Sequence, residues 1–290
     1  MRKTLNLFIL LLVAPPAFLF AQDDLLKELE ESTPKDTAYA FQTFKSTRLV
    51  NGQTIETKSK GTLEFIFAHR FGAINDGSYE LFGLDQAHVR IGLEYGITDR
   101  LGVGVGRSSF DKIVDGFLRY KVLQQKKGAS NFPFTMTTFG SVSYKSSPKD
   151  GIEDIDRLAY TGQLLIARKF SPRISLQVMP TLVHRNAVDK LTENNNQLAL
   201  GMGGRIKVSK SIALTSEYYY RINSNPNTLN HNALGLGIDI ETGGHVFQLV
   251  MTNTRGTLER AFITETTGEF FDGGIHFGFN VTRTFQVRKK

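Results

Sequence analysis

The chain has 290 residues, of which 40% are hydrophobic, 27 are glycine and 22 are phenylalanine, and this composition favours one large all-β domain over two small ones. It contains no cysteine, which excludes disulfide bonds, thiolate zinc sites and cysteine nucleophiles. The net charge of +7 is spread along the chain without a block of lysine and arginine, which disfavours nucleic acid as a partner.

Residues 1–21 have the pattern of an export signal that is removed from the mature protein. Arg2 and Lys3 precede an apolar stretch over residues 5–20, and Ala21 is the expected cleavage position. A transmembrane anchor is the alternative, but two prolines interrupt the stretch and polar residues follow it directly. No later run of about eighteen apolar residues occurs, so strands must make any other membrane crossing.

Residues 22–60 are expected to form a periplasmic lead-in made of a helix and a hairpin. Residues 23–31 have the pattern of a short helix with an acidic start, and Pro34 sets its end. Asn51 and Gly52 then stand between two alternating arms, which is the two-residue signal for a β-hairpin. The sequence leaves open whether this hairpin begins a barrel or lies inside its mouth.

Residues 61–290 have the pattern of a β-barrel. Segments of about ten residues alternate in hydrophobicity, so each strand can present one apolar face and one small or polar face. In residues 87–98, for example, Val89 and Ile91 share the apolar face, opposite His88 and Arg90. About twelve strands are expected. They cover residues 62–71, 87–98, 101–108, 112–123, 132–145, 157–169, 174–184, 197–208, 212–221, 233–240, 246–253 and 275–287.

The connections distinguish a membrane barrel from a soluble β-sandwich, whose strands would also alternate. When the connections are counted along the chain, every second one is in most cases a short turn rich in Gly, Pro, Asp or Ser. Most of the connections in the other set are long and polar, and these long ones are residues 72–86, 146–156, 185–196, 223–232 and 254–274. Bacterial outer-membrane barrels have this asymmetry, with short periplasmic turns and longer external loops. The sequence therefore predicts a closed antiparallel transmembrane β-barrel in the bacterial outer membrane.

Charged side chains of both signs occupy the predicted inner face of the barrel. They are Glu64, Arg70, His88, Arg90, Glu94, Asp115, Arg119, Lys121, Arg205, Lys207, Glu217, Arg221 and Asp239. One interpretation is that these groups pair across the lumen and fill it, which avoids the cost of lone buried charges. The other is that they line a narrow aqueous channel, for which mixed charge predicts weak ion selectivity.

Enzyme motifs and cofactor sites are not indicated. The G-x-S-x-G and H-E-x-x-H patterns are absent, and the six histidines lack ligand spacing. Arg107 replaces the third glycine that a dinucleotide fingerprint would need, so the glycines of residues 101–108 indicate a strand whose small face leaves room in the barrel. The acidic loop around Asp154 lacks the ligand pattern of a calcium loop. We therefore expect no enzyme activity, no cofactor and no metal site.

Residues 44–72, 83–109 and 116–123 together resemble an uncharacterised family of bacterial outer-membrane β-barrels, a domain of unknown function. The resemblance extends from about residue 41 to the C-terminus. It implies the fold and the location, and no catalytic residue comes with it.

Two functions are expected as alternatives. One is a narrow, weakly selective channel for small solutes, and the other is a closed barrel that serves as a scaffold or receptor for a periplasmic or surface partner. A soluble exported β-protein is a third possibility. The expected contacts are outer-membrane lipid and, during biogenesis, the barrel-assembly machinery, because residues 275–287 resemble the aromatic-rich final strands that this machinery recognises.

Overall fold

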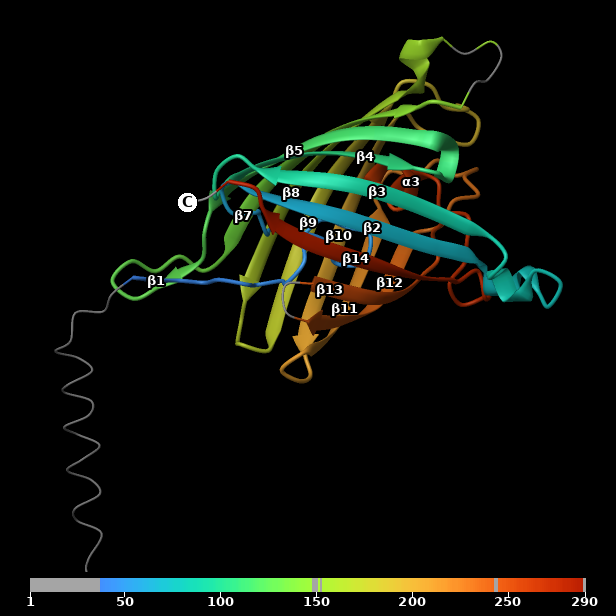
Figure 1. Ribbon diagram of the computed structural model, residues 1–290. Coiled ribbons are helices and arrows are strands. Elements are labelled where there is room, and N and C mark those ends of the chain that lie inside the picture. The colour runs from blue at the N-terminus through green and yellow to red at the C-terminus, as the bar shows by residue number, and fades with distance from the viewer. Residues whose placement is uncertain (1–36, 148–150, 152, 243–244, 289–290) are drawn as a thin grey trace, which may run out of the picture.

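A single closed antiparallel barrel of twelve strands dominates the computed structural model (Figure 1). The structure describes residues 37–147, 151, 153–242 and 245–288. The predicted export signal and the predicted helix over residues 23–31 lie outside these residues. The all-β barrel and its number of strands are confirmed.

The barrel strands follow one another around the ring in chain order, and the last strand pairs with the first to close it. They are β2 (Thr62–Ala73), β3 (Ala87–Gly96), β4 (Leu101–Ser108), β5 (Ile113–Leu123), β7 (Thr135–Lys145), β8 (Leu158–Lys169), β9 (Ile174–Arg185), β10 (Asn196–Lys207), β11 (Ile212–Arg221), β12 (Ala233–Thr242), β13 (His245–Thr252) and β14 (His276–Gln286).

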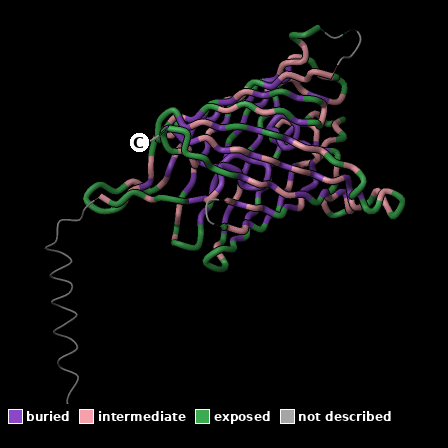
Figure 2. Tube along the Cα trace, in the orientation of Figure 1, coloured by how far each residue is buried: buried purple, intermediate pink, exposed green. Residues whose placement is uncertain are grey.

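Side chains alternate across the barrel wall as the sequence predicts. Along β9 exposed and buried positions alternate over most of the strand, with Met179 and Val183 buried and Val178 and Leu182 exposed. Buried and exposed positions alternate in this way around the barrel (Figure 2). The ring therefore presents apolar side chains outward and has no unpaired strand edge, which are the two conditions that a lipid environment sets.

The short turns and the long loops lie at opposite ends of the barrel. The C-terminal end of β14 and the short strand β1 (Ala38–Tyr39) both lie at the short-turn end (Figure 1). There β1 pairs with β6 (Lys126–Lys127), which belongs to the longer connection between β5 and β7. The connections at the long-loop end carry four short 3-10 helices, η1 (Ile74–Asp76), η2 (Leu81–Gly83), η3 (Phe110–Lys112) and η4 (Asp154–Arg157), of which η3 lies in the short link between β4 and β5.

Strand β7 and the loop over residues 254–274 differ from the sequence prediction. Strand β7 begins at Thr135 instead of residue 132, because Pro133 has no N–H to donate to the ladder. The predicted loop over residues 254–274 contains a helix, α3 (Glu259–Thr264), and all its residues are buried. Among the described residues, no helix is both long and apolar enough to cross a membrane.

The outward position of Val105 near the middle of β4 gives a direct test of the lipid-facing surface, because its side chain is 60% exposed. We expect Val105→Arg to destabilise the barrel by about 2–4 kcal/mol, since a charge would face lipid near the midplane. The matched change Val287→Arg, just beyond the end of β14, should cost about 0–1 kcal/mol. Urea unfolding in phospholipid vesicles measures both, and equal costs would contradict this placement.

Candidate functional site in the lumen

A hairpin from the N-terminal part of the chain lies inside the barrel. Residues 43–55 are buried apart from the half-buried Lys45. Arg48 and Gln53 form an antiparallel bridge, and Leu49 N donates to Gly52 O at 2.9 Å. The predicted hairpin therefore forms, but it turns at Val50–Asn51, one residue before the predicted Asn51–Gly52, and Gly52 does not have the positive φ of a type I′ turn. We call residues 43–57 the plug. The sequence grouped this hairpin with the lead-in and left open whether it begins the barrel or lies inside its mouth, and the structure places it within the lumen.

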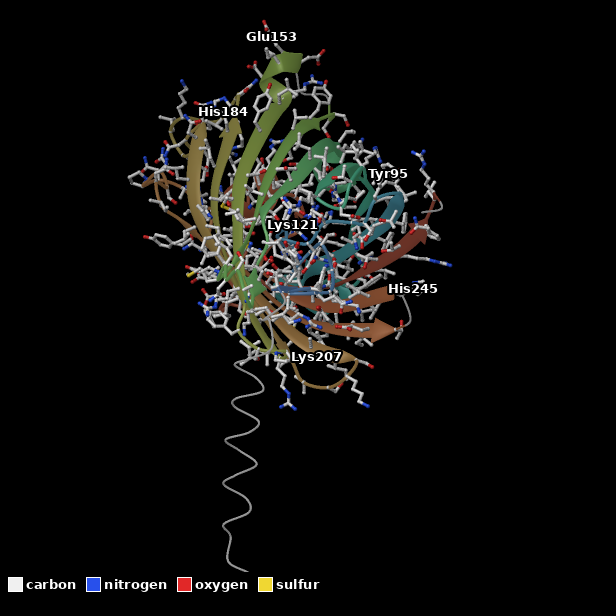
Figure 3. All side chains as sticks on the ribbon, turned by 90° about the vertical axis from the view of Figure 1, so that its left-hand side faces the viewer. Tyr95, Lys121, Glu153, His184, Lys207 and His245 are labelled. Carbon is white, nitrogen blue, oxygen red and sulfur yellow. The ribbon has the colours of Figure 1, made fainter. Side chains whose placement is uncertain are left out.

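The plug enters the barrel from the short-turn end. Asp99, in the turn between β3 and β4, accepts hydrogen bonds from Lys60 N at 2.9 Å and from Thr57 Oγ1 at 2.7 Å. Figure 3 looks at this end and shows side chains crowding the barrel around Lys121, with Lys207 at the rim. The chain that follows the plug is therefore tied to the rim before β2 begins.

Glu217 of β11 holds the tip of the plug. Its carboxylate accepts hydrogen bonds from the backbone N–H groups of Val50 (3.1 Å), Asn51 (2.8 Å) and Gly52 (2.9 Å). Only 3% of Glu217 is exposed, so these donors replace the water that an ionised carboxylate would otherwise need. Hydrogen bonds to a charged group contribute about 1.5–3 kcal/mol each, so this carboxylate attaches the tip of the hairpin firmly to the wall.

Two wall arginines bind the backbone of the plug from the other side. Arg119 of β5 donates to Thr54 O (3.3 Å), Glu56 O (2.9 Å) and the side chain of Gln53. Arg70 of β2 donates to Asn51 Oδ1 at 2.8 Å and to Val50 O at 3.2 Å. Groups from opposite parts of the ring therefore satisfy the polar groups of the hairpin, as buried polar groups require.

The apolar side chains of the plug fit against small residues of the wall. A Cβ added at Gly203 would lie 2.6 Å from Leu49 Cδ1, and one at Gly235 would lie 2.9 Å from Val50 Cγ1. Both distances are too short for real carbon contacts, so only glycine leaves room for the plug at these two positions.

The long loop between β13 and β14 folds into the barrel from the opposite end. We call residues 253–266, which include α3, the cap. Phe262 is fully buried and its ring centroid lies 4.9 Å from that of Tyr219. Glu259 of the cap pairs with Arg48 (3.3 Å) and accepts a hydrogen bond from Gln53 (2.7 Å). Plug and cap therefore meet within the lumen and close it from both ends.

Several predicted inward charges form ion pairs along the wall instead of across the lumen. Arg90 Nη2 of β3 lies 2.6 Å from Asp115 Oδ2 of β5, and Arg119 Nε of β5 lies 3.0 Å from Glu94 Oε1 of β3. The strand between them, β4, has glycines beneath these pairs, and a Cβ at Gly106 would clash with the guanidinium of Arg90. The pairs lie along the wall because the plug occupies the centre.

The other predicted inward residues divide into paired and half-buried groups. Glu64 pairs with Lys58 and accepts from Thr47 of the plug, and Arg221 pairs with Glu193. Arg205 bonds Glu241 and lies 3.9 Å from Asp239. The half-buried residues are His88, Lys121 and Lys207.

Sequence reasoning missed the residues outside the wall strands that complete this site. Arg48 and Gln53 lie in a segment for which the hairpin signal gave the local structure but not the location. Glu259 lies in what reads as an ordinary polar loop. The apolar run of residues 261–263 inside that loop was the available signal that part of it is buried.

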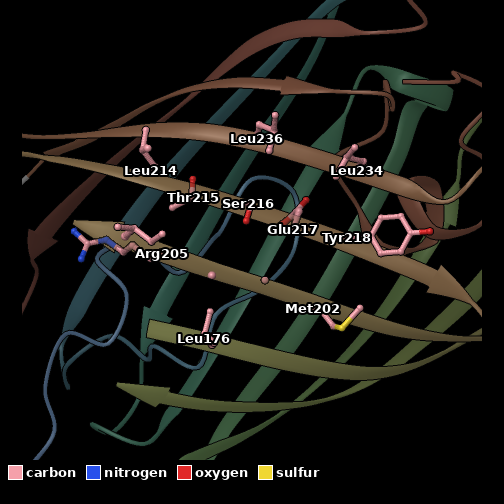
Figure 4. A pocket seen from close by; sticks show the side chains of 13 residues that line it. Leu176, Met202, Arg205, Leu214, Thr215, Ser216, Glu217, Tyr218, Leu234 and Leu236 are labelled. Carbon is pink, nitrogen blue, oxygen red and sulfur yellow. The ribbon is translucent and has the colours of Figure 1, made fainter. Parts of the chain in front are cut away.

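A separate depression lies on the outer wall over β10, β11 and β12 (Figure 4). The exposed side chains of Met202, Leu214 and Leu236 border it, and the small residues Gly204 and Ser216 form its floor. It faces away from the lumen, where the charged residues lie.

A family model described as "Membrane bound beta barrel domain (DUF5777)" matches residues 44–285, which include the cap and, except for one residue at each end of the match, the plug and the twelve barrel strands. The chain belongs to this family. The resemblance seen in residues 44–72, 83–109 and 116–123 is thereby confirmed, and the protein is a membrane-bound β-barrel. None of the curated proteins matches the chain.

Solved structures of porins are similar in fold to this membrane barrel. The NanC porin is 8% identical with a TM-score of 0.48, over 78% of this chain and all of that one. The KdgM porin is 9% identical with a TM-score of 0.47, over 77% of this chain and 99% of that one. A mutant porin of Rhodopseudomonas blastica is 10% identical with a TM-score of 0.33, over 68% and 55% of the two chains.

Gly52 tests whether the plug tip is held as described. A Cβ at this position would overlap Tyr219 Oη and lie 3.1 Å from Glu217 Oε2, so Gly52→Ala should push the tip away from its carboxylate. We expect faster amide hydrogen exchange over residues 46–55, because the three N–H bonds to Glu217 lengthen or break. Gly162→Ala is the matched control, since its Cβ would meet open space, and unchanged exchange in Gly52→Ala would count against this geometry.

Proposed function

We propose that this protein is an outer-membrane barrel that is closed at rest by its plug and cap, and that it passes small solutes only when the plug is displaced. The observation that carries the proposal is the triple hydrogen bond from the plug tip to Glu217. A hairpin that merely rested in an open pore would not need a buried carboxylate of the wall at its turn.

The outer-membrane location rests on two features of the chain. The predicted export signal would bring the protein out of the cytoplasm, and the asymmetry between short turns and long loops fits the periplasmic and external sides of that membrane. We further propose that the barrel-assembly machinery inserts it, since outward-facing Phe277, Phe279 and Phe285 give β14 the aromatic character of a final strand.

We also propose that the chain is not an enzyme. The buried carboxylates and guanidinium groups of the lumen bind the plug, the cap or one another, as Glu217, Glu259 and Asp115 do. Their hydrogen-bonding capacity is therefore used in holding the closed state.

Conductance in planar bilayers tests the closed resting state. We expect the wild-type protein to be silent and Glu217→Gln and Gly52→Ala to open intermittently, because each change weakens the attachment of the plug tip. The openings should show weak ion selectivity, since charges of both signs line the wall. Gly162→Ala should stay silent, and steady conductance of the wild type would refute the closed barrel.

A scaffold or receptor role is the second candidate, and the short-turn end favours it. There Tyr39 and Phe41 are 45% and 69% exposed, beside the cationic side chains of Lys126, Lys127 and Lys169. Exposed aromatic residues next to positive charge are a common surface for protein contacts.

Site-specific photo-crosslinking in living cells tests this second role. A photoreactive residue at position 41 should give a discrete adduct with a periplasmic protein if a partner binds the β1–β6 surface. The same residue at the exposed Leu229, in a long loop at the other end, is the control. The absence of an adduct specific to position 41 would speak against a partner at this surface.

A further inference from the structure

The depression over β10, β11 and β12 is a gap in the surface that faces lipid (Figure 4). Its floor is the cross-strand pair of Gly204 and Ser216, two small residues that leave it unfilled. The large apolar side chains of Met202, Leu214 and Leu236 border it. Its volume is about 460 Å³, within the usual range of ligand sites of about 300–1,000 Å³. The lining therefore suits an apolar chain.

The depression lies at the depth of lipid acyl chains on the short-turn side of the membrane. On β11 its lining includes Leu214 and Tyr218, which follow Lys210 of the preceding turn by four and eight residues. A tilted strand advances roughly 10 Å in depth over four residues and roughly 20 Å over eight. Since the hydrocarbon core is about 30 Å thick, these positions span the acyl region of one leaflet.

Two adjoining turns at that end carry only basic charge. Residues 170–173 and 207–211 contain Arg173, Lys207 and Lys210 and no acidic residue. Lys207 N donates to Arg173 O at 2.8 Å, so the two turns lie side by side. Arg173 and Lys210 are exposed, and none of the ion pairs among the described residues includes either of them. Their charges therefore remain available to an anionic headgroup at the membrane surface.

The carboxylate of the next short turn is engaged elsewhere. Glu241 N donates to Ser211 O at 2.8 Å, which places Glu241 beside the turn that holds Lys210. Its side chain, however, binds Arg205 and Lys45. The basic turns are therefore left without a neutralising partner from this neighbour.

We propose that this part of the outer wall binds one acidic diacyl phospholipid of the leaflet on the short-turn side. One acyl chain fills the depression between Met202, Leu214 and Leu236, and the phosphate lies against Arg173 and Lys210. A second copy of the chain fits less well, because a symmetric dimer in one membrane would bring the same basic turns of both copies together. The site requires only the membrane-bound barrel and does not depend on the channel activity proposed above.

Brominated lipids test the site in vesicles, because the chain has no tryptophan and a single introduced one reports the lipid beside it. Leu236→Trp places the reporter at the depression, and Leu93→Trp places a control on β3, across the ring. The two leucines are matched, at 43% and 40% exposed. Chain-brominated phosphatidylglycerol and phosphatidylcholine are compared as quenchers in phosphatidylcholine vesicles at low ionic strength. We expect about tenfold preference for phosphatidylglycerol at position 236 and almost none at position 93, and equal preferences at both would refute the site.

Charge variants in the Leu236→Trp protein test the headgroup contacts. Arg173→Gln combined with Lys210→Gln should remove the preference for phosphatidylglycerol, since both cations that face the phosphate are lost. Arg100→Gln is the matched control, because Arg100 is an exposed arginine in the short turn between β3 and β4, across the ring. This control should keep the preference. A preference that survives the loss of both Arg173 and Lys210 would overturn the assignment.

Ser216→Leu tests the depression itself, because it fills the floor and leaves the basic turns intact. The full-length protein is refolded in vesicles with equal amounts of the two unbrominated lipids and extracted in mild detergent, and native mass spectrometry counts the lipids that stay bound. Wild type should keep one phosphatidylglycerol, and Ser216→Leu should lose most of it. Thr138→Leu, at an exposed position of β7 outside the depression, is the control and should keep it. Equal retention by wild type and Ser216→Leu, equal retention of the two lipids, or a lipid-free dimer would contradict the proposal.

Discussion

The pairing of β14 with β2 closes the sheet, and the rest of the structure depends on that closure. Lipid offers no hydrogen bonds to an open strand edge, so a spanning sheet must close on itself. A ring of eight strands can be filled by its own side chains, and rings of sixteen or more leave an aqueous channel. Twelve strands fall between these cases. Here the intermediate lumen is filled by additional chain, the plug from one end and the cap from the other.

A polar filling of this kind is stable only if its groups are paired. The wall supplies a carboxylate to the plug's backbone N–H groups through Glu217 and guanidinium donors to its carbonyl groups through Arg119. The wall's own charges are then neutralised along neighbouring strands, and the glycine face of β4 gives the pairs of Arg90 and Arg119 the space they need. Mixed charge in the lumen therefore holds the inserted segment, because buried groups such as Glu217 and Arg119 find partners in the plug that replace water.

Contact between plug and cap connects the two ends of the barrel. Glu259 of the cap binds Arg48 and Gln53 of the plug, so a movement of the loop between β13 and β14 would remove the acceptor of both side chains. Tyr219 contributes to the same junction, since its ring packs on Phe262 and a Cβ at Gly52 would overlap its hydroxyl. The closed state is therefore one cooperative arrangement of wall, plug and cap.

The sequence by itself determined the barrel strands, the faces of their side chains, the ends of the barrel and the presence of a hairpin near Asn51, whose turn the structure places one residue earlier, at Val50–Asn51. These features depend on a period of two residues and on local turn chemistry, which act over a few neighbouring positions. Only the tertiary structure decided where the hairpin lies and that the lumen is closed. The groups that fix the hairpin are distant in sequence, with Glu217 165 residues from Gly52 and Glu259 206 residues from Gln53. Such partners meet only after the ring has closed, so no local pattern in residues 43–57 or 253–266 could reveal them.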